Sequence, residues 1–261
     1  MATQHKDQYN TVATQYSSYD DLPMSDLECE LIRAALGDCT NASVLDLGGG
    51  SGTHARAAIS AGAARVDVVD ISDGMMGVGK ELAAKAGMAD KIRWVTADAS
   101  KSLASQGGAG DVVLGLGGYD IVMANWVFDH AHTVDDLKGM WSNIVSALKP
   151  GGRFVGIRIV RDGIFADYVK WGKYGCKYEN IEEIPGGYSC MVYIMTDPPF
   201  SFGGTMMRDS FDMINEIPTG LGMVDFAIVL AEETETIKKD PVFWKEHLEE
   251  PLFVVATARK A

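Results

Sequence analysis

The sequence predicts an α/β domain built on a parallel sheet with helices on both faces. Short apolar segments of strand character alternate with helix patterns between residues 43 and 159. The 261 residues, 47% of them hydrophobic, suffice for one such domain with a sizeable insertion. Ligands of such sheets bind at the carboxyl ends of the strands, so the turns there are the places to search for a site.

The alternating region divides into strands and helices as follows. Strands are predicted at Ser43–Leu47, Arg65–Asp70, Ile92–Thr96, Tyr119–Ala124 and Arg153–Ile159, and helices at Thr53–Ser60, Asp73–Ala86 and Thr133–Leu148. The last of these helices carries a continuous apolar stripe. The Gly/Ser-rich residues 100–118 predict a surface loop, and Lys149–Gly152 predicts a turn before the fifth strand.

The two ends of the chain have a different texture. Ser25-Asp26-Leu27-Glu28 matches a capping box, which predicts the start of a helix that ends near Gly37. Towards the C-terminus we expect helices over 164–178 and Met207–Ile217, a β-rich insertion over 179–205 with a strand at Tyr188–Thr196, and strands at Met223–Leu230 and Leu252–Ala258.

Charge and cysteine usage restrict the class of partner. A net charge of −13 disfavours nucleic acid and anionic membranes as partners and favours a small molecule. No apolar run approaches the roughly 18 residues of a spanning helix, and the N-terminus lacks the apolar core of a secretory signal. The cysteines lack close pairs and the acids lack divalent-cation spacing, so we expect reduced thiols, no metal site and a cytoplasmic location.

The segment after the first strand, Asp46-Leu47-Gly48-Gly49-Gly50-Ser51-Gly52, predicts a cofactor loop. Glycines there let the backbone pass close to a ligand, and the amides at the following helix start can face a polar group. A dinucleotide fingerprint needs a third glycine where Thr53 stands. The acidic-x-G-x-G-x-G pattern instead resembles motif I of the class I methyltransferases that use S-adenosylmethionine (SAM), in which the leading acid lies near the ammonium group of SAM.

Two further strand ends carry carboxylates. Asp70 can accept both ribose hydroxyls, a feature shared with NAD enzymes, although it can instead belong to the cap of the next helix, for which Ser72 and Asp73 are better placed. Asp98 followed by Ala99 resembles the pair that holds the adenine edge in these methyltransferases, and the alternative is a surface-loop acid. Ile71 and Met75 are candidates to enclose the adenine ring.

The fourth strand ends in Asn125-Trp126-Val127-Phe128-Asp129-His130. The resemblance implies that Asn125 and Trp126 contact the methionine part of SAM. His130 is a candidate general base, because an unperturbed imidazole titrates near neutral pH. In the family a similar histidine often only braces the loop, so both interpretations stay open. Tyr9, Tyr16 and Tyr19 resemble a leader that folds over the cofactor, and a frayed terminus is the alternative.

The resemblance covers about residues 40–160 and implies a seven-stranded Rossmann-like sheet whose final strand is antiparallel. It divides the chain into a leader and helix closing the site (1–38), a SAM-binding core (39–160), a β-containing lid (161–217) and the last strands (218–261). Asp197-Pro198-Pro199-Phe200 is similar to a motif of DNA amino-methyltransferases, but it lies outside the fourth strand end, so a turn is expected.

The implied activity is transfer of a methyl group from SAM to an O, N or S atom of a small molecule. The aromatic and methionine content of 161–217 favours a planar or apolar acceptor. Two alternatives remain at this point: a Rossmann-type NAD(P)-dependent oxidoreductase, and a non-catalytic SAM-binding protein.

Overall fold

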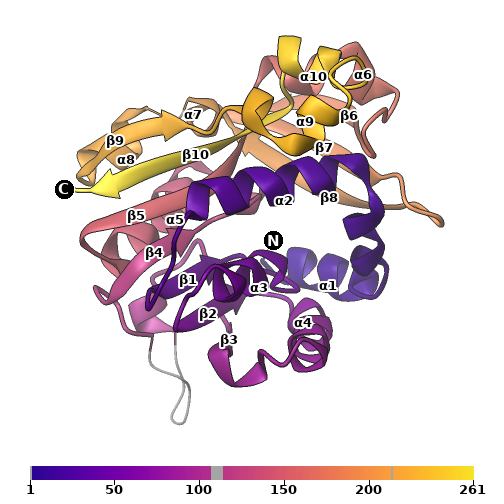
Figure 1. Cartoon of the computed structure of the whole chain (residues 1–261). Helices are drawn as coiled ribbons and strands as arrows, with labels where there is room; N and C mark the ends of the chain where they lie inside the picture. Colours follow the sequence, from indigo (N-terminus) through magenta and orange to yellow (C-terminus); the bar gives the residue numbers. More distant parts are fainter. Residues whose placement is uncertain (1, 107–113, 213) are drawn as a thin grey trace.

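A seven-stranded sheet forms the centre of the molecule, with strand order β3-β2-β1-β4-β5-β10-β9 (Figure 1). This computed structural model describes residues 2–106, 114–212 and 214–261. The strands are β1 (Ser43–Leu47), β2 (Arg65–Asp70), β3 (Ile92–Thr96), β4 (Tyr119–Met123), β5 (Leu148–Ile159), β9 (Met223–Ile228) and β10 (Phe253–Lys260). β10 runs antiparallel to both of its neighbours, as expected, and the pairs from β3 to β5 are parallel.

Helices cover both faces of this sheet because the strand side chains alternate. Val44 of β1 packs in one apolar core with α2 (Pro23–Leu36) and α3 (Thr53–Ser60). Leu45 of β1 packs in a second core with α5 (Val134–Ala147) on the opposite face. The cofactor loop lies in the βαβ unit formed by β1, α3 and β2, and α4 (Asp73–Lys85) follows β2.

A three-stranded antiparallel sheet forms a second layer beside the first. It consists of β6 (Cys176–Ile184), β7 (Gly187–Ile194) and β8 (Phe200–Met207) in that order. β8 packs against the 3₁₀ helix η4 (Val127–His130) that follows β4. The N-terminal helix α1 (Ala2–Val12) contacts both α4 and β8, and therefore bridges the two layers (Figure 1).

Short helices complete the chain. They are the 3₁₀ helices η1 (Gln15–Asp21), η2 (Ala89–Lys91), η3 (Leu103–Ser105), η5 (Asp162–Phe165) and η6 (Ala231–Glu233), and the α-helices α6 (Asp167–Lys170), α7 (Arg208–Phe211), α8 (Glu216–Gly220), α9 (Glu235–Lys239) and α10 (Lys245–Glu249). Within the described ranges, no helix combines the length and apolar character needed to cross a bilayer.

The predicted capping box at Ser25–Glu28 is wrong. α2 begins three residues earlier, at Pro23, and its N-cap residue Leu22 makes no side-chain capping bond. Proline has the φ of a first helical turn and lacks the N–H that would need a partner there, so it starts the helix without a cap. Glu28 is thereby on the inner face of α2, with 4% of its surface exposed.

Other expectations also differ from the structure. Lys149–Gly152 is not a separate turn but lies inside β5, where the pairing with β4 shifts register. The helix expected over 164–178 is reduced to η5 and α6, because Gly172 and Gly175 take positive φ and turn the chain. The helix expected at Met207–Ile217 is wrong: Met207 ends β8, and only α7 and the start of α8 lie in that range. The loop predicted over 100–118 contains η3, and its residues 107–113 lie outside the described part.

Candidate functional site

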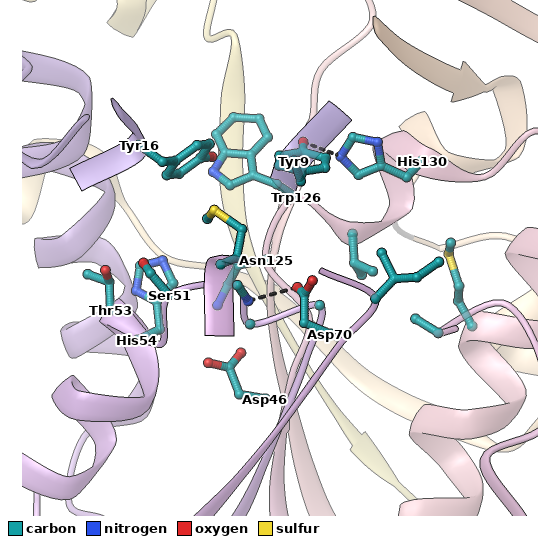
Figure 2. Close-up of a pocket in the computed structure, with 18 of the residues that line it drawn as sticks. Tyr9, Tyr16, Asp46, Ser51, Thr53, His54, Asp70, Asn125, Trp126 and His130 are labelled. Atoms are coloured by element: carbon teal, nitrogen blue, oxygen red, sulfur yellow. Dashed lines mark hydrogen bonds between the residues drawn. The ribbon is translucent and has the colours of Figure 1, made fainter. Parts of the chain in front are cut away.

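A cavity of about 370 Å³ opens where the carboxyl ends of β1, β2 and β4 meet. Its wall contains all but one of the residues singled out from the sequence: Tyr9, Tyr16, Asp46, Gly48, Gly49, Gly50, Asp70, Ile71, Met75, Asp98, Ala99, Asn125, Trp126 and His130. Gly52 does not line the cavity. It is the N-cap of α3 with φ +71°, and a Cβ on it would lie 2.6 Å from the Trp94 ring. In Figure 2, Tyr9, Tyr16 and Trp126 lie on one side of the cavity, with Asp46 and Asp70 on the other.

Asp46 presents a buried carboxylate to this cavity. Its side chain is 1% exposed, and neither carboxylate oxygen has a hydrogen-bond partner among the described residues. Burial raises the Asp46 pKa to about 6, because the charged form loses its hydration. Gly49 passes so close that a Cβ on it would lie 2.6 Å from the Asp46 carboxyl carbon. Position 49 therefore requires glycine, because a side chain there would collide with the Asp46 carboxyl group.

Asp70 holds the glycine loop in place. Its Oδ2 accepts a 2.8 Å hydrogen bond from the Gly50 amide, and its Oδ1 accepts one of 2.8 Å from the Ser72 amide. Burial raises the pKa of Asp70, and these amide donors partly oppose that rise. The cap of α4 is Ser72, whose hydroxyl accepts from the Met75 amide, so Asp70 is left to face the cavity.

Asp98 organises the next strand end. Its Oδ1 accepts from both the amide and the hydroxyl of Ser100, at 2.8 and 2.7 Å. The side-chain amide of Gln106 bonds both the N–H and the C=O of Asp98 at 2.8 Å. These contacts fix the Asp98–Ser100 turn along the cavity wall.

The N-terminal leader is folded over the cavity. The Tyr9 hydroxyl lies 2.9 Å from His130 Nε2, and the two rings meet edge to face (Figure 2). Burial raises the Tyr9 pKa well above its usual value, so the phenol keeps its proton and can donate to the imidazole. Two residues of α1 also contact α4: Lys6 pairs with Asp73, and Asn10 accepts from the Gly74 amide at 2.9 Å.

Glu28 is a site residue that the sequence interpretation missed. Its carboxylate accepts from the Tyr19 hydroxyl at 2.7 Å and the Trp126 indole N–H at 2.9 Å, and it lies 2.8 Å from His54 Nε2. Burial lowers the His54 pKa, but the hydrogen bond and charge of Glu28 outweigh it and raise the pKa overall. In the sequence, Glu28 was assigned to the capping box. Its position on the apolar side of α2 was the only signal that its side chain points inward.

A second cavity of about 40 Å³ adjoins the first, between the leader tyrosines and the small sheet. Tyr9, Tyr16, Tyr19, Trp126 and His130 line both cavities. The far wall comes from β6, β7 and β8, and its residues are Cys176, Tyr178, Cys190, Val192, Ile194, Phe202, Gly204 and Met206. The small sheet therefore closes a compartment next to the larger cavity.

Comparison with known proteins agrees with this arrangement. Residues 44–152 match a family model described as a methyltransferase domain. Over 100% of this chain and 99% of the other, the structure is similar to the CcbJ methyltransferase from Streptomyces caelestis, with 17% identity and a TM-score of 0.66. The DhpI–SAH complex has 19% identity and a TM-score of 0.58, covering 100% of this chain and 97% of the other.

A third solved structure is geranyl diphosphate C-methyltransferase from Streptomyces coelicolor A3(2), with 15% identity and a TM-score of 0.54. The similarity covers 90% of this chain and 75% of that one. No curated protein matches the sequence. At such identities the structural likeness shows a shared fold.

Proposed function

We propose that this chain is a class I SAM-dependent methyltransferase, which binds SAM in the 370 Å³ cavity and methylates a small molecule from the adjoining compartment. One observation carries the proposal: the ends of three neighbouring strands bring Asp46, Asp70 and Asp98 to the wall of one cavity. SAM, when bound, supplies a methyl group made electrophilic by its sulfonium.

The polar groups without partners on the wall suit the methionine part of SAM. Asp46 offers carboxylate oxygens that no described residue satisfies, which suits an ammonium group. The Nδ2 of Asn125 likewise lacks a partner within the described residues and can donate to a carboxylate. Such unpaired buried groups are costly in the free protein, so a ligand that pairs both gains affinity.

The remaining wall suits the nucleoside. Asp70 is assigned to the ribose hydroxyls and Asp98 to the adenine amino group, with Ile71 and Met75 against the ring. Tyr9, Tyr16 and Trp126 cover the opposite side and exclude water from the sulfonium.

His130 is better placed to brace than to abstract a proton. Its Nε2 is already engaged by the Tyr9 hydroxyl, which keeps its proton because burial raises its pKa. The pair joins η4 to the leader helix, so we assign His130 to holding the leader closed over SAM.

The insertion 161–217 is assigned to acceptor selection. Its three strands supply the apolar far wall of the compartment, which suits the apolar parts of an acceptor. Exchange of this segment with that of a relative should change which acceptors are methylated.

Isothermal calorimetry with SAM, S-adenosylhomocysteine (SAH), NADH and NADPH tests the assignment of the cavity. SAM and SAH should bind and the nicotinamide cofactors should not. Asp70→Ala removes two charged hydrogen-bond acceptors and should weaken SAM binding by about 10- to 100-fold. The exposed Asp135→Ala is the matched control and should leave binding unchanged. Absence of SAM binding, or full binding by Asp70→Ala, would contradict the proposal.

A further inference from the structure

The 40 Å³ compartment is lined mostly by aromatic rings and other apolar groups. The rings come from Tyr9, Tyr16, Tyr19, Trp126, Tyr178 and Phe202. Aromatic faces around a small space attract cations, and they exclude the water that would otherwise hydrate them. Because this wall is continuous with that of the larger cavity, a group held here lies next to the proposed SAM site.

The titratable groups of this wall carry little charge apart from one carboxylate. Burial raises the pKa of the Cys190 thiol to about 12 and also raises the pKa values of Cys176 and Tyr178, so these groups stay neutral at pH 7. Among the described residues no lysine or arginine lines the compartment. Asp129 does line it, as the third residue of η4. Its carboxylate is the source of negative charge at this wall.

The Asp129 carboxylate takes no part in the polar contacts that hold the described fold together. Within the described part of the chain, its carboxylate makes no hydrogen bond or ion pair, and Arg158 influences it only through charge at longer range. The Arg158 guanidinium instead stacks 4.2 Å above the Phe128 ring and donates to the Ser210 carbonyl at 2.6 Å. A partly desolvated carboxylate without a partner is costly unless a ligand pairs with it.

We infer that the acceptor is an amine, which the Asp129 carboxylate and the surrounding aromatic rings hold in its ammonium form. The inference rests on the proposed function, since it names the substrate class of the same site. A phosphate or carboxylate acceptor would face Asp129 without a countercharge. A neutral alcohol or thiol would leave the Asp129 carboxylate without a direct ion-pair partner.

The same carboxylate can take the proton that must leave before transfer. The bound ammonium gives one proton to Asp129, which frees the nitrogen lone pair. The nitrogen then forms a bond to the methyl carbon of SAM while the carbon–sulfur bond breaks, and that electron pair stays on sulfur, giving SAH. The product is a methylated ammonium, and Asp129 releases its proton as the product leaves. Burial raises the Asp129 pKa to about 7, which suits a proton acceptor at neutral pH.

Two small cyclic molecules of almost equal shape, one cationic and one neutral, test the inference. Pyrrolidine is a cation at neutral pH and tetrahydrofuran is neutral, so their difference in affinity reports the charge preference of the compartment. Binding to the SAH-loaded protein is measured by ligand-observed NMR titration. We expect pyrrolidine to bind at least about tenfold more tightly than tetrahydrofuran, and mass spectrometry to detect N-methylpyrrolidine when SAM replaces SAH.

The variant Asp129→Asn keeps the shape and removes the charge. It should lose the preference for pyrrolidine while keeping wild-type SAH affinity and a thermal midpoint at least as high as that of the wild type, and the exposed Asp135→Asn should keep the preference. Equal binding of the two rings, binding of neither, or an unchanged preference in Asp129→Asn would overturn the inference. Failure of the wild-type protein to bind SAH would instead overturn the proposed function.

Discussion

The Trp126 indole N–H donates to the Glu28 carboxylate at 2.9 Å, which joins the loop after β4 to the inner face of α2. Trp126 has a φ of +59°, a left-handed conformation that non-glycine residues rarely adopt, so its position needs support from the surrounding structure. Glu28 supplies that support and also holds Tyr19 and His54. The wall shared by the two cavities therefore depends on one buried carboxylate.

Glu28→Gln should disturb both cavities. The amide places a donor among groups that are themselves donors, so at least one hydrogen bond is lost at a cost of about 1–3 kcal/mol. We expect a lower free energy of unfolding and roughly tenfold weaker SAM binding, measured by urea denaturation and calorimetry. Asp26→Asn, on the exposed side of the same helix, is the control and should change neither quantity. Unchanged SAM affinity in Glu28→Gln would show that the network does not shape the site.

Asp46→Asn should make the free protein more stable while weakening SAM binding. Folding raises the Asp46 pKa to about 6 from an unfolded value near 4, so the folded state holds the proton more tightly. The stability contributed by this group is present at pH 4 and is lost as the pH rises towards and through 6.

The variant should therefore be more stable than wild type at pH 8 by about 2 kcal/mol, and the difference should shrink at pH 4. Urea denaturation at the two pH values measures this. At pH 8, SAM binding should weaken at least tenfold, because the ammonium loses its charged partner. A variant that is less stable at pH 8 would contradict this view of Asp46.

Gly49→Ala should abolish SAM binding by displacing the loop. The new Cβ would lie 2.6 Å from the Asp46 carboxyl carbon and 3.0 Å from Val68, so the backbone must shift. The matched control is Gly77→Ala in α4, where a Cβ meets nothing within 4 Å. That change should stabilise the protein by about 0.5–1 kcal/mol through helix propensity and leave SAM affinity unchanged. Calorimetry of both variants measures the SAM affinity, and thermal denaturation measures the stability.

Tyr9→Phe should loosen the leader without removing the ring. Loss of the hydrogen bond to His130 costs about 1 kcal/mol, so SAH should dissociate roughly fivefold faster in stopped-flow measurements. In a double-mutant cycle with His130→Ala, the second change should then have little further effect on the dissociation rate. Additive effects would mean that the two residues act independently of each other.

The sequence predicted the central βαβ region well because its signals are local. The bounds of β1, α3, β2 and β3 agree with prediction to the residue, and the Asp46–Gly52 loop lies where the alternation of strands and helices requires. Alternating apolar side chains, turn glycines and strand ends are properties of neighbouring residues. These patterns can therefore be recognised in the sequence alone.

Contacts between distant segments were decided only by the tertiary structure. Glu28 was assigned to a helix cap, yet its bond to Trp126 spans 98 residues, and the Tyr9–His130 bond spans 121. Asp129 drew no notice in the sequence because its charge matters only once the small sheet has enclosed it. The sequence alone determined the sheet, the glycine loop and the acids at its strand ends. The packing of the leader, α2 and the small sheet determined which buried charges keep partners, because burial and pairing are properties of the assembled chain.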